Sequence, residues 1–412
     1  MKKMLYNCLK RVYYSFLRLR FFLLRLLILR EVRKNRSVNV FFIISSLPMW
    51  RLQTLYDRLM QDPRYHLCII LIPFDTFSVE QQNSSISELR SYFDSRSITY
   101  LDASRDVISE DCWKAMNPQI IFYQQMYSTM YHGTFSINNN LDKLICYLPY
   151  ALLTVKGDWV YNTKFTNCAW RLFYPTKLHA DYAQTHSYNH GKNIRVVGEP
   201  DAALFGKEHD IRVNGNNKQV IWAPHYSIVG GGKLHRASFL WMADMMLKLA
   251  AEYKNSITFI IKPHPRLIST LYSLPEWGKQ NTDLYFDRWA KGDNTRIETG
   301  QYIELFKSSD AMIHDCGSFT AEYLFTGKPV MFISSNIEKV YDELDYFGSK
   351  CLDLHYHGST RKDIVSFLET VVLKDEDPLK KERLLFRDSF LTQKGCNTVG
   401  DAIYSSMTAD LF

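Results

Sequence analysis

Runs of apolar residues alternate with polar, helix-like stretches along most of the chain after residue 36. The first run, residues 38–47 (VNVFFIISSL), is continuous and ends in small polar residues, which is typical of a strand buried on both faces of a parallel sheet. This alternation predicts a parallel, doubly wound sheet, so residues 37–205 form one Rossmann-like domain. Its further strands are expected at 66–73, 97–101, 119–123 and 194–197, and its helices at 50–60, 79–93 and 107–116.

Three segments of this first domain are predicted to build its functional surface. Residues 123–136 and 144–150 follow strands, so we expect them to line the crevice at the carboxyl ends of the sheet. Residues 161–188 are rich in aromatic side chains and are expected on the acceptor side, although such a stripe also suits a core. The pair His132-Gly133 could be catalytic or simply part of a polar loop.

A second alternating series follows a charged, Gly- and Asn-rich stretch at 206–217, which reads as an interdomain linker. Residues 218–375 are predicted to form a second Rossmann-like domain that binds the nucleotide donor, and residues 376–412 to be helices that cross back to the first domain. Its expected elements are strands at 219–223, 256–262, 311–313 and 329–333, and helices at 236–253, before 311 and after 318. We therefore expect an α/β protein with two Rossmann-like domains facing a cleft.

The length of 412 residues favours two domains, and the hydrophobic content of 46% is enough for two cores. The net charge of +7 is unevenly distributed. Residues 1–36 hold eleven Lys or Arg and one acidic residue, which gives +10 there and leaves −3 for the rest. The body of the protein therefore lacks the positive charge that nucleic-acid binding requires.

The basic arm at residues 1–36 interleaves arginines with leucines and aromatic residues. Its longest apolar runs, 21–24 and 26–29, are far shorter than the roughly 20 residues that span a bilayer, and no cleavage site of a signal peptide follows. This pattern predicts an amphipathic helix in the headgroup region of an anionic membrane, at its cytoplasmic face. The alternative is a helix that packs on the protein itself.

The eight cysteines are scattered singly and show no spacing of a metal site, so we expect reduced thiols. No acidic pair of the DxD type stands at a predicted strand end, so we expect no bound metal, and we expect no tightly bound cofactor.

Three predicted strand ends of the second domain carry polar residues, at the edge where open parallel sheets bind ligands. The first is WAPHYSIVGGGK, with His225 and the flexible glycines Gly231 and Gly232. The second is IIKPHPR, with Lys262, His264 and Arg266, and the third is HDCGSFTAE, which follows the strand at 311–313. In the third stretch Asp315 precedes a Gly317-Ser318 turn that opens a helix, and Phe319, Thr320 and Glu322 lie on that helix.

The chemistry of these residues suits a nucleotide-activated donor. Lys262, Arg266 and the N–H groups of the turn would neutralise a diphosphate, and Glu322 could accept hydrogen bonds from a ribose. His225 or His264 could take a proton from an attacking hydroxyl or donate to a phosphoryl oxygen, although a histidine at a strand end is also often satisfied by the backbone. Asp315 could orient an imidazole or cap the following helix.

The order PH, KPHP and YIELFKSSDAMIHDCGSFTAEYLFTGKPVMF resembles the CDP-glycerol:poly(glycerophosphate) glycerophosphotransferase family, the teichoic-acid and capsule polymerases of GT-B fold. The resemblance covers about residues 120–375 and is most specific at 302–332. It places His264 on a histidine of the family's second domain, and Asp315, Gly317 and Ser318 on its phosphate-binding turn. It implies transfer of an alditol phosphate from a CDP-alditol to a lipid-linked or polymeric acceptor of the bacterial cell envelope, with release of CMP.

Two other functions stay open. A GT-B glycosyltransferase of capsule or O-antigen synthesis would use a nucleotide-sugar, for which Glu322 is equally suited. A membrane-bound nucleotide-binding protein without catalysis would not need the histidines.

Overall fold

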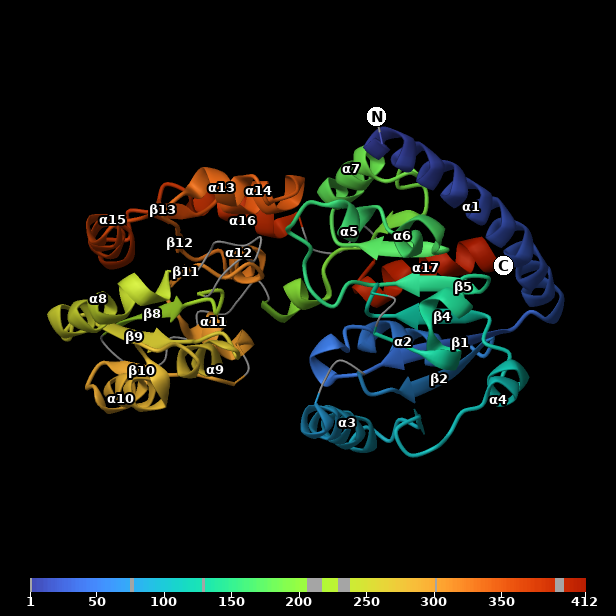
Figure 1. Cartoon of the computed structure of the whole chain (residues 1–412), viewed down its shortest axis with the longest axis horizontal. Coiled ribbons are helices and arrows are strands. Elements are labelled where there is room, and N and C mark those ends of the chain that lie inside the picture. Colours follow the sequence, from blue (N-terminus) through green and yellow to red (C-terminus); the bar gives the residue numbers. More distant parts are fainter. Residues whose placement is uncertain are drawn as a thin grey trace. The chain divides into compact units, whose positions relative to one another are not determined.

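The computed structural model describes residues 2–74, 78–127, 130–205, 217–228, 238–300, 302–389 and 396–412. The chain divides into two compact units. Unit 1 comprises Met1–Ala151, Lys156–Asp201 and Leu391–Phe412, and unit 2 comprises Leu152–Val155 and Ala202–Phe390. The first and last segments of the chain therefore belong to the same unit (Figure 1).

Unit 1 contains a sheet of seven parallel strands in the order β3-β2-β1-β4-β5-β6-β7. The chain adds strands outward on one side of β1 and then, from β4, on the other, so the direction reverses between β1 and β4. The strands are β1 (Val38–Ile44), β2 (Tyr65–Leu71), β3 (Leu101–Asp102), β4 (Ile120–Tyr123), β5 (Leu144–Tyr147), β6 (Arg171–Tyr174) and β7 (Ile194–Val196).

The central strands of unit 1 are buried along their whole length, as their continuous apolar sequences require. Val40 of β1 pairs with Ile120 of β4, which pairs with Leu144 of β5.

The helices of unit 1 are α1 (Lys2–Asn35), α2 (Gln53–Met60), α3 (Val79–Asp94), α4 (Glu110–Ala115), α5 (Asp158–Tyr161), α6 (Lys164–Cys168), α7 (Lys177–His186) and α17 (Val399–Leu411). Short 3-10 turns lie at Leu47–Met49, Gly133–Phe135, Ile137–Asn139 and Pro200–Phe205, and the last of these continues into unit 2.

One prediction for unit 1 was wrong in detail, and for a second segment the structure decides between two alternatives. Residues 144–150 were expected to follow a strand and to line the crevice, but Leu144–Tyr147 is itself the buried strand β5. Residues 161–188 were expected on the acceptor side or in the core, and they contain strand β6 and core residues such as Phe165 and Phe173. In both segments the strand has only four residues, which is too short to be recognised without its neighbours in the sheet.

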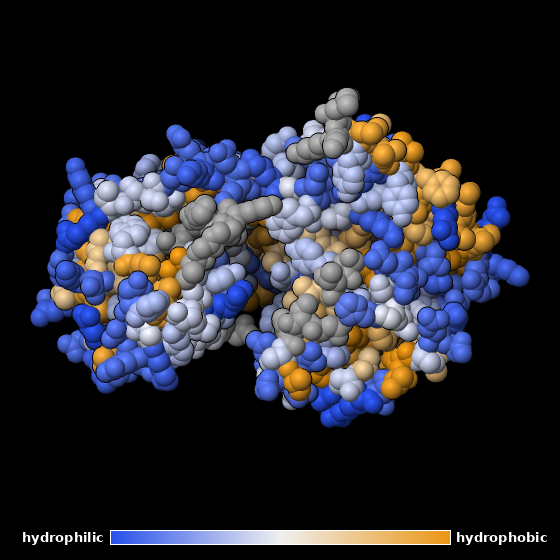
Figure 2. All heavy atoms as spheres, viewed as in Figure 1, coloured by the Kyte–Doolittle hydropathy of each residue, from blue (hydrophilic) through white to orange (hydrophobic). Residues whose placement is uncertain are grey.

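The N-terminal residues form one long helix, α1, which runs beside α6 and α17 of unit 1 (Figure 1). Tyr14, Leu17, Phe21 and Val32 are buried against the unit. The opposite face is exposed and apolar, and Figure 2 shows apolar side chains gathered along the place of α1. In the part of the chain that the structure describes, every helix is too short or too polar to cross a bilayer.

Arg25 fastens α1 to unit 1 from within. Its guanidinium donates to the backbone oxygens of Leu141 (2.7 Å), Lys143 (2.9 Å) and Cys168 (2.6 Å), in the connections that precede β5 and β6. Burial lowers the pKa of Arg25 to about 10, so the group stays charged at neutral pH. These three bonds make α1 an integral part of unit 1, which corresponds to the alternative of a helix packed on the protein itself.

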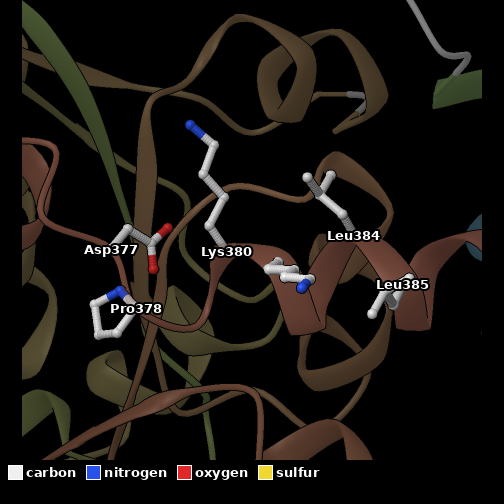
Figure 3. A pocket seen from close by; sticks show the side chains of 6 residues that line it. Asp377, Pro378, Lys380, Leu384 and Leu385 are labelled. Carbon is white, nitrogen blue, oxygen red and sulfur yellow. The ribbon is translucent and has the colours of Figure 1, made fainter.

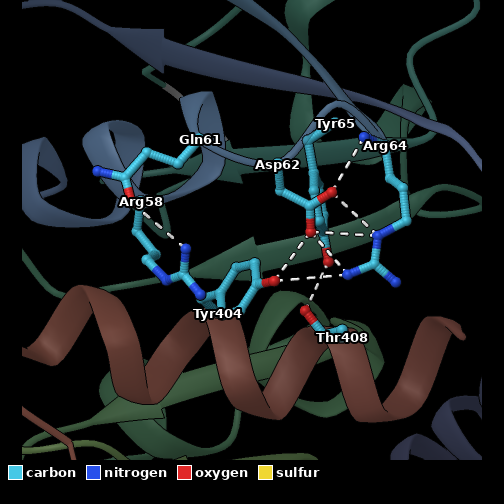
Figure 4. A network of polar contacts seen from close by, with 7 residues as sticks. All are labelled: Arg58, Gln61, Asp62, Arg64, Tyr65, Tyr404 and Thr408. Carbon is cyan, nitrogen blue, oxygen red and sulfur yellow. Dashed lines mark hydrogen bonds and ion pairs between the residues drawn. The ribbon is translucent and has the colours of Figure 1, made fainter.

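The C-terminal helix α17 completes the core of unit 1. Ile403, Met407 and Leu411 pack into the same cluster as residues of β1, β2 and α2. Figure 4 shows the polar side of this contact, where the Tyr404 hydroxyl donates to Asp62 (2.8 Å) and Arg64 also binds that carboxylate (2.6 Å). The Arg64 hydrogen bond holds the pKa of Asp62 below its usual range.

Unit 2 contains a second parallel sheet, in the order β10-β9-β8-β11-β12-β13. Its direction reverses between β8 and β11. The strands are β8 (Lys218–Ala223), β9 (Ile257–Ile261), β10 (Thr295–Ile297), β11 (Ala311–His314), β12 (Val330–Ile333) and β13 (Tyr356–Gly358). The helices are α8 (Phe239–Glu252), α9 (Leu267–Tyr272), α10 (Gly278–Lys291), α11 (Ile303–Ser308), α12 (Phe319–Glu322), α13 (Ile337–Tyr341), α14 (Tyr346–Leu352), α15 (Arg361–Ser366) and α16 (Lys380–Asp388), with a 3-10 turn at Tyr323–Thr326 and a π-helical turn at Phe367–Leu373.

The tail predicted at 376–412 divides between the units. Helix α16 belongs to unit 2, where the buried Arg383 pairs with Asp377, and α17 belongs to unit 1. An open depression of about 420 Å³ lies beside α16 (Figure 3). Its lining residues are Asp377, Pro378, Lys380, Lys381, Leu384 and Leu385.

The Arg25→Met variant tests the attachment of α1. Removing the guanidinium leaves buried carbonyl oxygens without a donor, so we expect the free energy of unfolding to fall by about 2 to 4 kcal/mol. Urea denaturation of the full chain measures this loss. Arg30→Met, on an exposed position of the same helix, should change the value by less than about 0.5 kcal/mol. Equal effects of the two substitutions would contradict the role of Arg25.

Candidate active site

Polar residues follow three neighbouring strands of unit 2. His225 lies two residues after β8, Lys262 directly follows β9, and the turn at Asp315–Ser318 directly follows β11. Because β9, β8 and β11 are adjacent and parallel, these residues share one edge of the sheet. This edge includes the reversal between β8 and β11, where open α/β sheets bind their ligands.

Two of the predicted histidines lie together at this edge. The rings of His225 and His264 are 5.0 Å apart between centroids, and Tyr226 contacts both, at 4.5 and 4.4 Å. The guanidinium of Arg266 lies over the Tyr226 ring at 4.5 Å. We call these four residues the histidine cluster. The structure thus brings His225, His264 and Arg266 together around an aromatic ring that the sequence interpretation did not assign.

The hydrogen bonds of the two imidazoles indicate where their protons lie. The backbone N–H of Arg266 donates to Nδ1 of His264 (3.1 Å), and that of Ser227 donates to Nδ1 of His225 (3.3 Å). The Ser227 hydroxyl is also within 2.9 Å of this nitrogen. A neutral imidazole whose Nδ1 accepts a hydrogen bond carries its proton on Nε2. Both neutral rings therefore have an N–H donor at Nε2.

His264 is held neutral. Burial, followed by the positive charge of Arg266, lowers the pKa of His264 to about 4. Burial also lowers the pKa of Lys262, whose ammonium donates to the backbone oxygen of Gly300 (2.7 Å). An ammonium has three N–H donors, so Lys262 can bind the Gly300 oxygen and an anionic ligand at the same time.

Asp315 connects the strand ends. Its buried carboxylate accepts hydrogen bonds from the backbone N–H of His225 (2.6 Å) and from the N–H and hydroxyl of Ser238 (2.6 and 2.8 Å). Burial raises the pKa of Asp315 to about 6, and these hydrogen bonds act against the rise. Neither expected role is seen, since Asp315 binds the backbone of His225 rather than its imidazole, and Ser318 occupies the N-cap of α12.

Two buried histidines, His314 and His355, stabilise the turn at Asp315–Ser318. Nδ1 of His314 accepts the N–H of Cys316 (3.1 Å), so its Nε2 donates to Nε2 of His355 (3.2 Å). Nδ1 of His355 then donates to the backbone oxygen of Cys351 (2.9 Å). Burial lowers the pKa of His355 well below its ordinary value. This chain of bonds requires both rings to be neutral.

The helix after the turn is shorter than expected. Helix α12 spans only Phe319–Glu322 and passes into a 3-10 turn at Tyr323–Thr326. Its dipole is therefore weak, and a phosphate at the turn would depend mainly on backbone N–H groups. Thr320 is buried and its hydroxyl donates to the oxygen of Cys316 (3.0 Å), so it stabilises the turn instead of facing a ligand.

The remaining predicted ligand residues differ in their exposure. Ser318 is exposed, and Gly317, Phe319 and Glu322 are partly exposed. Phe319 packs against the rings of Tyr302 and Phe306. Gly231 and Gly232 lie outside the described residues, as does most of the predicted linker.

No residue of this edge lines the depression beside α16 (Figure 3). Among the residues that the structure describes, no group of three or more His, Cys, Asp or Glu side chains is arranged to hold a metal ion.

Sequence reasoning missed Tyr226, Ser238 and His355. Tyr226 stood inside a quoted stretch and could have been noticed as the neighbour of His225. Ser238 and His355 act on the site from distant parts of the chain, and their partners Asp315 and His314 are known only once the fold is known.

The Asp315→Asn variant tests the connection of the strand ends. The asparagine amide keeps one acceptor oxygen, but its NH₂ group would face one of the N–H donors that Asp315 now binds. We therefore expect the free energy of unfolding to fall by about 2 to 3 kcal/mol. Chemical denaturation measures this loss. Asp287→Asn, on an exposed carboxylate of the same unit that pairs with Lys291, is the control and should cost less than about 1 kcal/mol. Wild-type stability of the Asp315→Asn variant would contradict the assignment.

The His355→Gln variant tests the neutral histidine pair. Below about pH 6.5 the unfolded chain binds a proton at His355 that the folded chain excludes, so folding stability falls as the pH falls, by at most roughly 1.4 kcal/mol per pH unit. Glutamine can replace both hydrogen bonds but does not titrate. Denaturation curves at pH 7 and pH 5 should therefore show a smaller loss in the variant than in the wild type. An unchanged loss would refute the neutral pair.

No protein-family model matches the sequence, and no curated protein sequence matches it significantly. Solved structures do match. A putative UDP-N-acetylglucosamine 2-epimerase from Listeria monocytogenes has a TM-score of 0.56 at 14% identity over 91% of this chain and 96% of the other. A UDP-GlcNAc 2-epimerase from Neisseria meningitidis, bound to UDP-GlcNAc, has a TM-score of 0.52 at 13% identity over 91% and 99%.

A variant of the wall teichoic acid polymerase TagF has a TM-score of 0.57 at 13% identity, over 100% of this chain and 98% of the other. At these identities the likeness concerns the fold alone. Together with the two parallel sheets and their helices, it identifies the chain as a protein of the GT-B fold.

Proposed function

We propose that this protein is a transferase that moves an alditol phosphate, such as glycerol phosphate, from a CDP-activated donor to a hydroxyl of a lipid-linked or polymeric cell-surface glycan. The by-product would be CMP. We propose that it acts at the cytoplasmic face of the membrane, the side on which nucleotide-activated donors are made. The enzyme would use no tightly bound cofactor and no metal, because basic side chains can neutralise the diphosphate.

The observation that supports this proposal is the assembly of the histidine cluster, Lys262 and the turn at Asp315–Ser318 on the edge of the sheet where its direction reverses. Three separate parts of the sequence contribute to it. Positive charge from Lys262 and Arg266, together with N–H donors, suits the two phosphates of a nucleoside diphosphate derivative.

In the proposed reaction the acceptor hydroxyl oxygen attacks the phosphorus atom that carries the alditol. A new P–O bond forms, the P–O bond to CMP breaks, and CMP leaves with the electron pair. The proton of the hydroxyl passes to a base or to solvent. Negative charge grows on the bridging oxygen and on the CMP phosphate, so donors placed there stabilise the transition state more than the ground state.

The proton positions of the histidines suit this donor role. Neutral His264, with its proton on Nε2, would donate to a phosphoryl oxygen, and so would His225. The low pKa of His264 makes it a poor acceptor of the hydroxyl proton. We therefore assign His264 the role of a donor and not that of the base.

Among proteins of similar fold, a TagF variant soaked with CDPG supports the choice of a cytidine donor. The 2-epimerases, of which one is bound to UDP-GlcNAc, support a second candidate, a GT-B glycosyltransferase that uses a nucleotide-sugar. Glu322, partly exposed one turn after Ser318, would serve the ribose of either donor. A membrane-bound nucleotide-binding protein without catalysis is a third possibility.

A labelled donor separates these candidates. We would incubate the protein with membranes and with CDP-glycerol labelled at the phosphate next to glycerol, and identify both products. Label in the acceptor together with CMP supports the phosphotransferase. UDP-sugars that yield UDP and unphosphorylated product support the glycosyltransferase instead, and donor-induced thermal stabilisation without turnover indicates the non-catalytic protein. If EDTA abolishes turnover, the metal-free scheme is wrong.

The His264→Gln variant tests the role of the cluster. Glutamine keeps an N–H donor but loses the rigid ring that the Arg266 backbone N–H orients, so we expect turnover to fall by at least about tenfold while the melting temperature stays near that of the wild type. His66→Gln, on an exposed histidine of β2, is the matched control and should keep full turnover. Unchanged activity of His264→Gln would exclude His264 from the reaction.

A further inference from the structure

Helix α1 has a second apolar face, whose side chains are largely exposed. Its residues recur every three or four positions, and each side chain is at least 55% exposed. We call this stripe the outer face of α1, and it consists of Leu5, Leu9, Val12, Phe16, Leu19, Leu23 and Leu27. Exposed Tyr6, Tyr13 and Phe22 widen it. A soluble protein rarely exposes so many neighbouring large apolar side chains unless they bind something.

The outer face lies opposite the face that packs on unit 1. At 100° per residue, the buried Tyr14, Leu17, Phe21 and Val32 point about half a turn away from the outer face. The outer face is therefore separate from the residues of α1 that pack in the core, and does not extend from them. Figure 2 shows the corresponding band of apolar side chains along α1.

Basic residues border the outer face. The exposed ones include Arg11, Arg20, Arg30 and Lys34, and the single acidic residue, Glu31, accepts a hydrogen bond from Asn117 (3.3 Å). Arginines beside leucines and aromatic rings can keep their charged groups at the level of lipid headgroups while their stems stay in apolar surroundings. The strongly positive charge fits an anionic surface and opposes contact with a second, equally charged copy of the helix.

We propose that the outer face of α1 binds an anionic lipid bilayer, with the helix axis in the membrane plane, and that it holds unit 1 in one fixed orientation. The fixed orientation follows from the inner bonds of α1. Arg25 binds three backbone oxygens of unit 1, and Arg33 donates to the backbone oxygens of Asp410 and Leu411 (both 3.2 Å) at the end of α17. The helix therefore binds lipid without leaving the protein body. This binding surface goes beyond the proposed transfer reaction and does not depend on it.

Flotation of the full chain with vesicles tests the surface, with no donor present. Phosphatidylcholine vesicles that contain about one-third phosphatidylglycerol should bind the protein, and vesicles of phosphatidylcholine alone should bind it at least about tenfold more weakly. The double variant Phe16→Glu/Leu23→Glu should lose at least about tenfold in binding at an unchanged melting temperature. Leu385→Glu, on an equally exposed leucine of α16, should bind like the wild type.

The proposal fails if the double variant binds vesicles like the wild type. It also fails if the wild type does not bind vesicles but sediments as a dimer, and the double variant sediments as a monomer. The outer face would then bind a second copy of the chain.

Acyl-chain quenching tests the fixed orientation. With brominated lipids, Phe16→Trp should add quenching above that of the wild type, whereas Tyr14→Trp, on the inner face, should add none. Added quenching of Tyr14→Trp to the same extent would show that α1 detaches, and would overturn the fixed orientation. Matching melting temperatures of both variants in solution establish that the substitutions leave the fold intact.

Discussion

The candidate site depends on one buried carboxylate. Asp315 follows β11 and accepts hydrogen bonds from the segment after β8 and from the start of α8, so a single side chain connects three elements. Such a carboxylate is stabilised in a buried position only because every donor is supplied by the protein. Burial nevertheless disfavours the charged carboxylate, which is why the pKa of Asp315 is raised. The gain is a rigid edge on which His225 has a defined position.

The same edge contains imidazoles whose tautomers are set by the backbone. Arg266 and Ser227 donate to Nδ1 of their neighbouring histidines, and the His314–His355 pair fixes its own protons in the same way beneath the turn. Donors that are already oriented need no reorganisation when charge develops on a phosphate. Under the proposed function, these donors would stabilise a leaving group and would not remove a proton.

Much of the fold could be predicted from the sequence, because long apolar runs such as those of β1 and β9 are typical of buried parallel strands. Short strands were harder to predict. Leu144–Tyr147 was not recognised as a strand, since four apolar residues have no clear period. Strand β3 proved to be two residues long, near the end of the predicted strand. The N-terminal helix was predicted, but its attachment through Arg25 was not, because the three carbonyl groups lie more than 110 residues away.

For the site, the strand-end rule located His225, Lys262, His264 and the turn from their positions in the sequence. It did not reveal that Asp315 would bind a backbone N–H, that Thr320 would be buried, or that α12 would be one turn long. These outcomes depend on which residues of other elements face the turn, and a single sequence does not contain that information in local form.

The central claim is that unit 2 binds a nucleoside diphosphate derivative at the ends of β8, β9 and β11. A crystal structure of the full chain with CDP bound tests it most directly. We expect phosphate oxygens within hydrogen-bond distance of Nε2 of His264 and of the backbone N–H groups at Gly317-Ser318. A nucleotide bound elsewhere on the chain, with this edge of the sheet unchanged, would contradict the account.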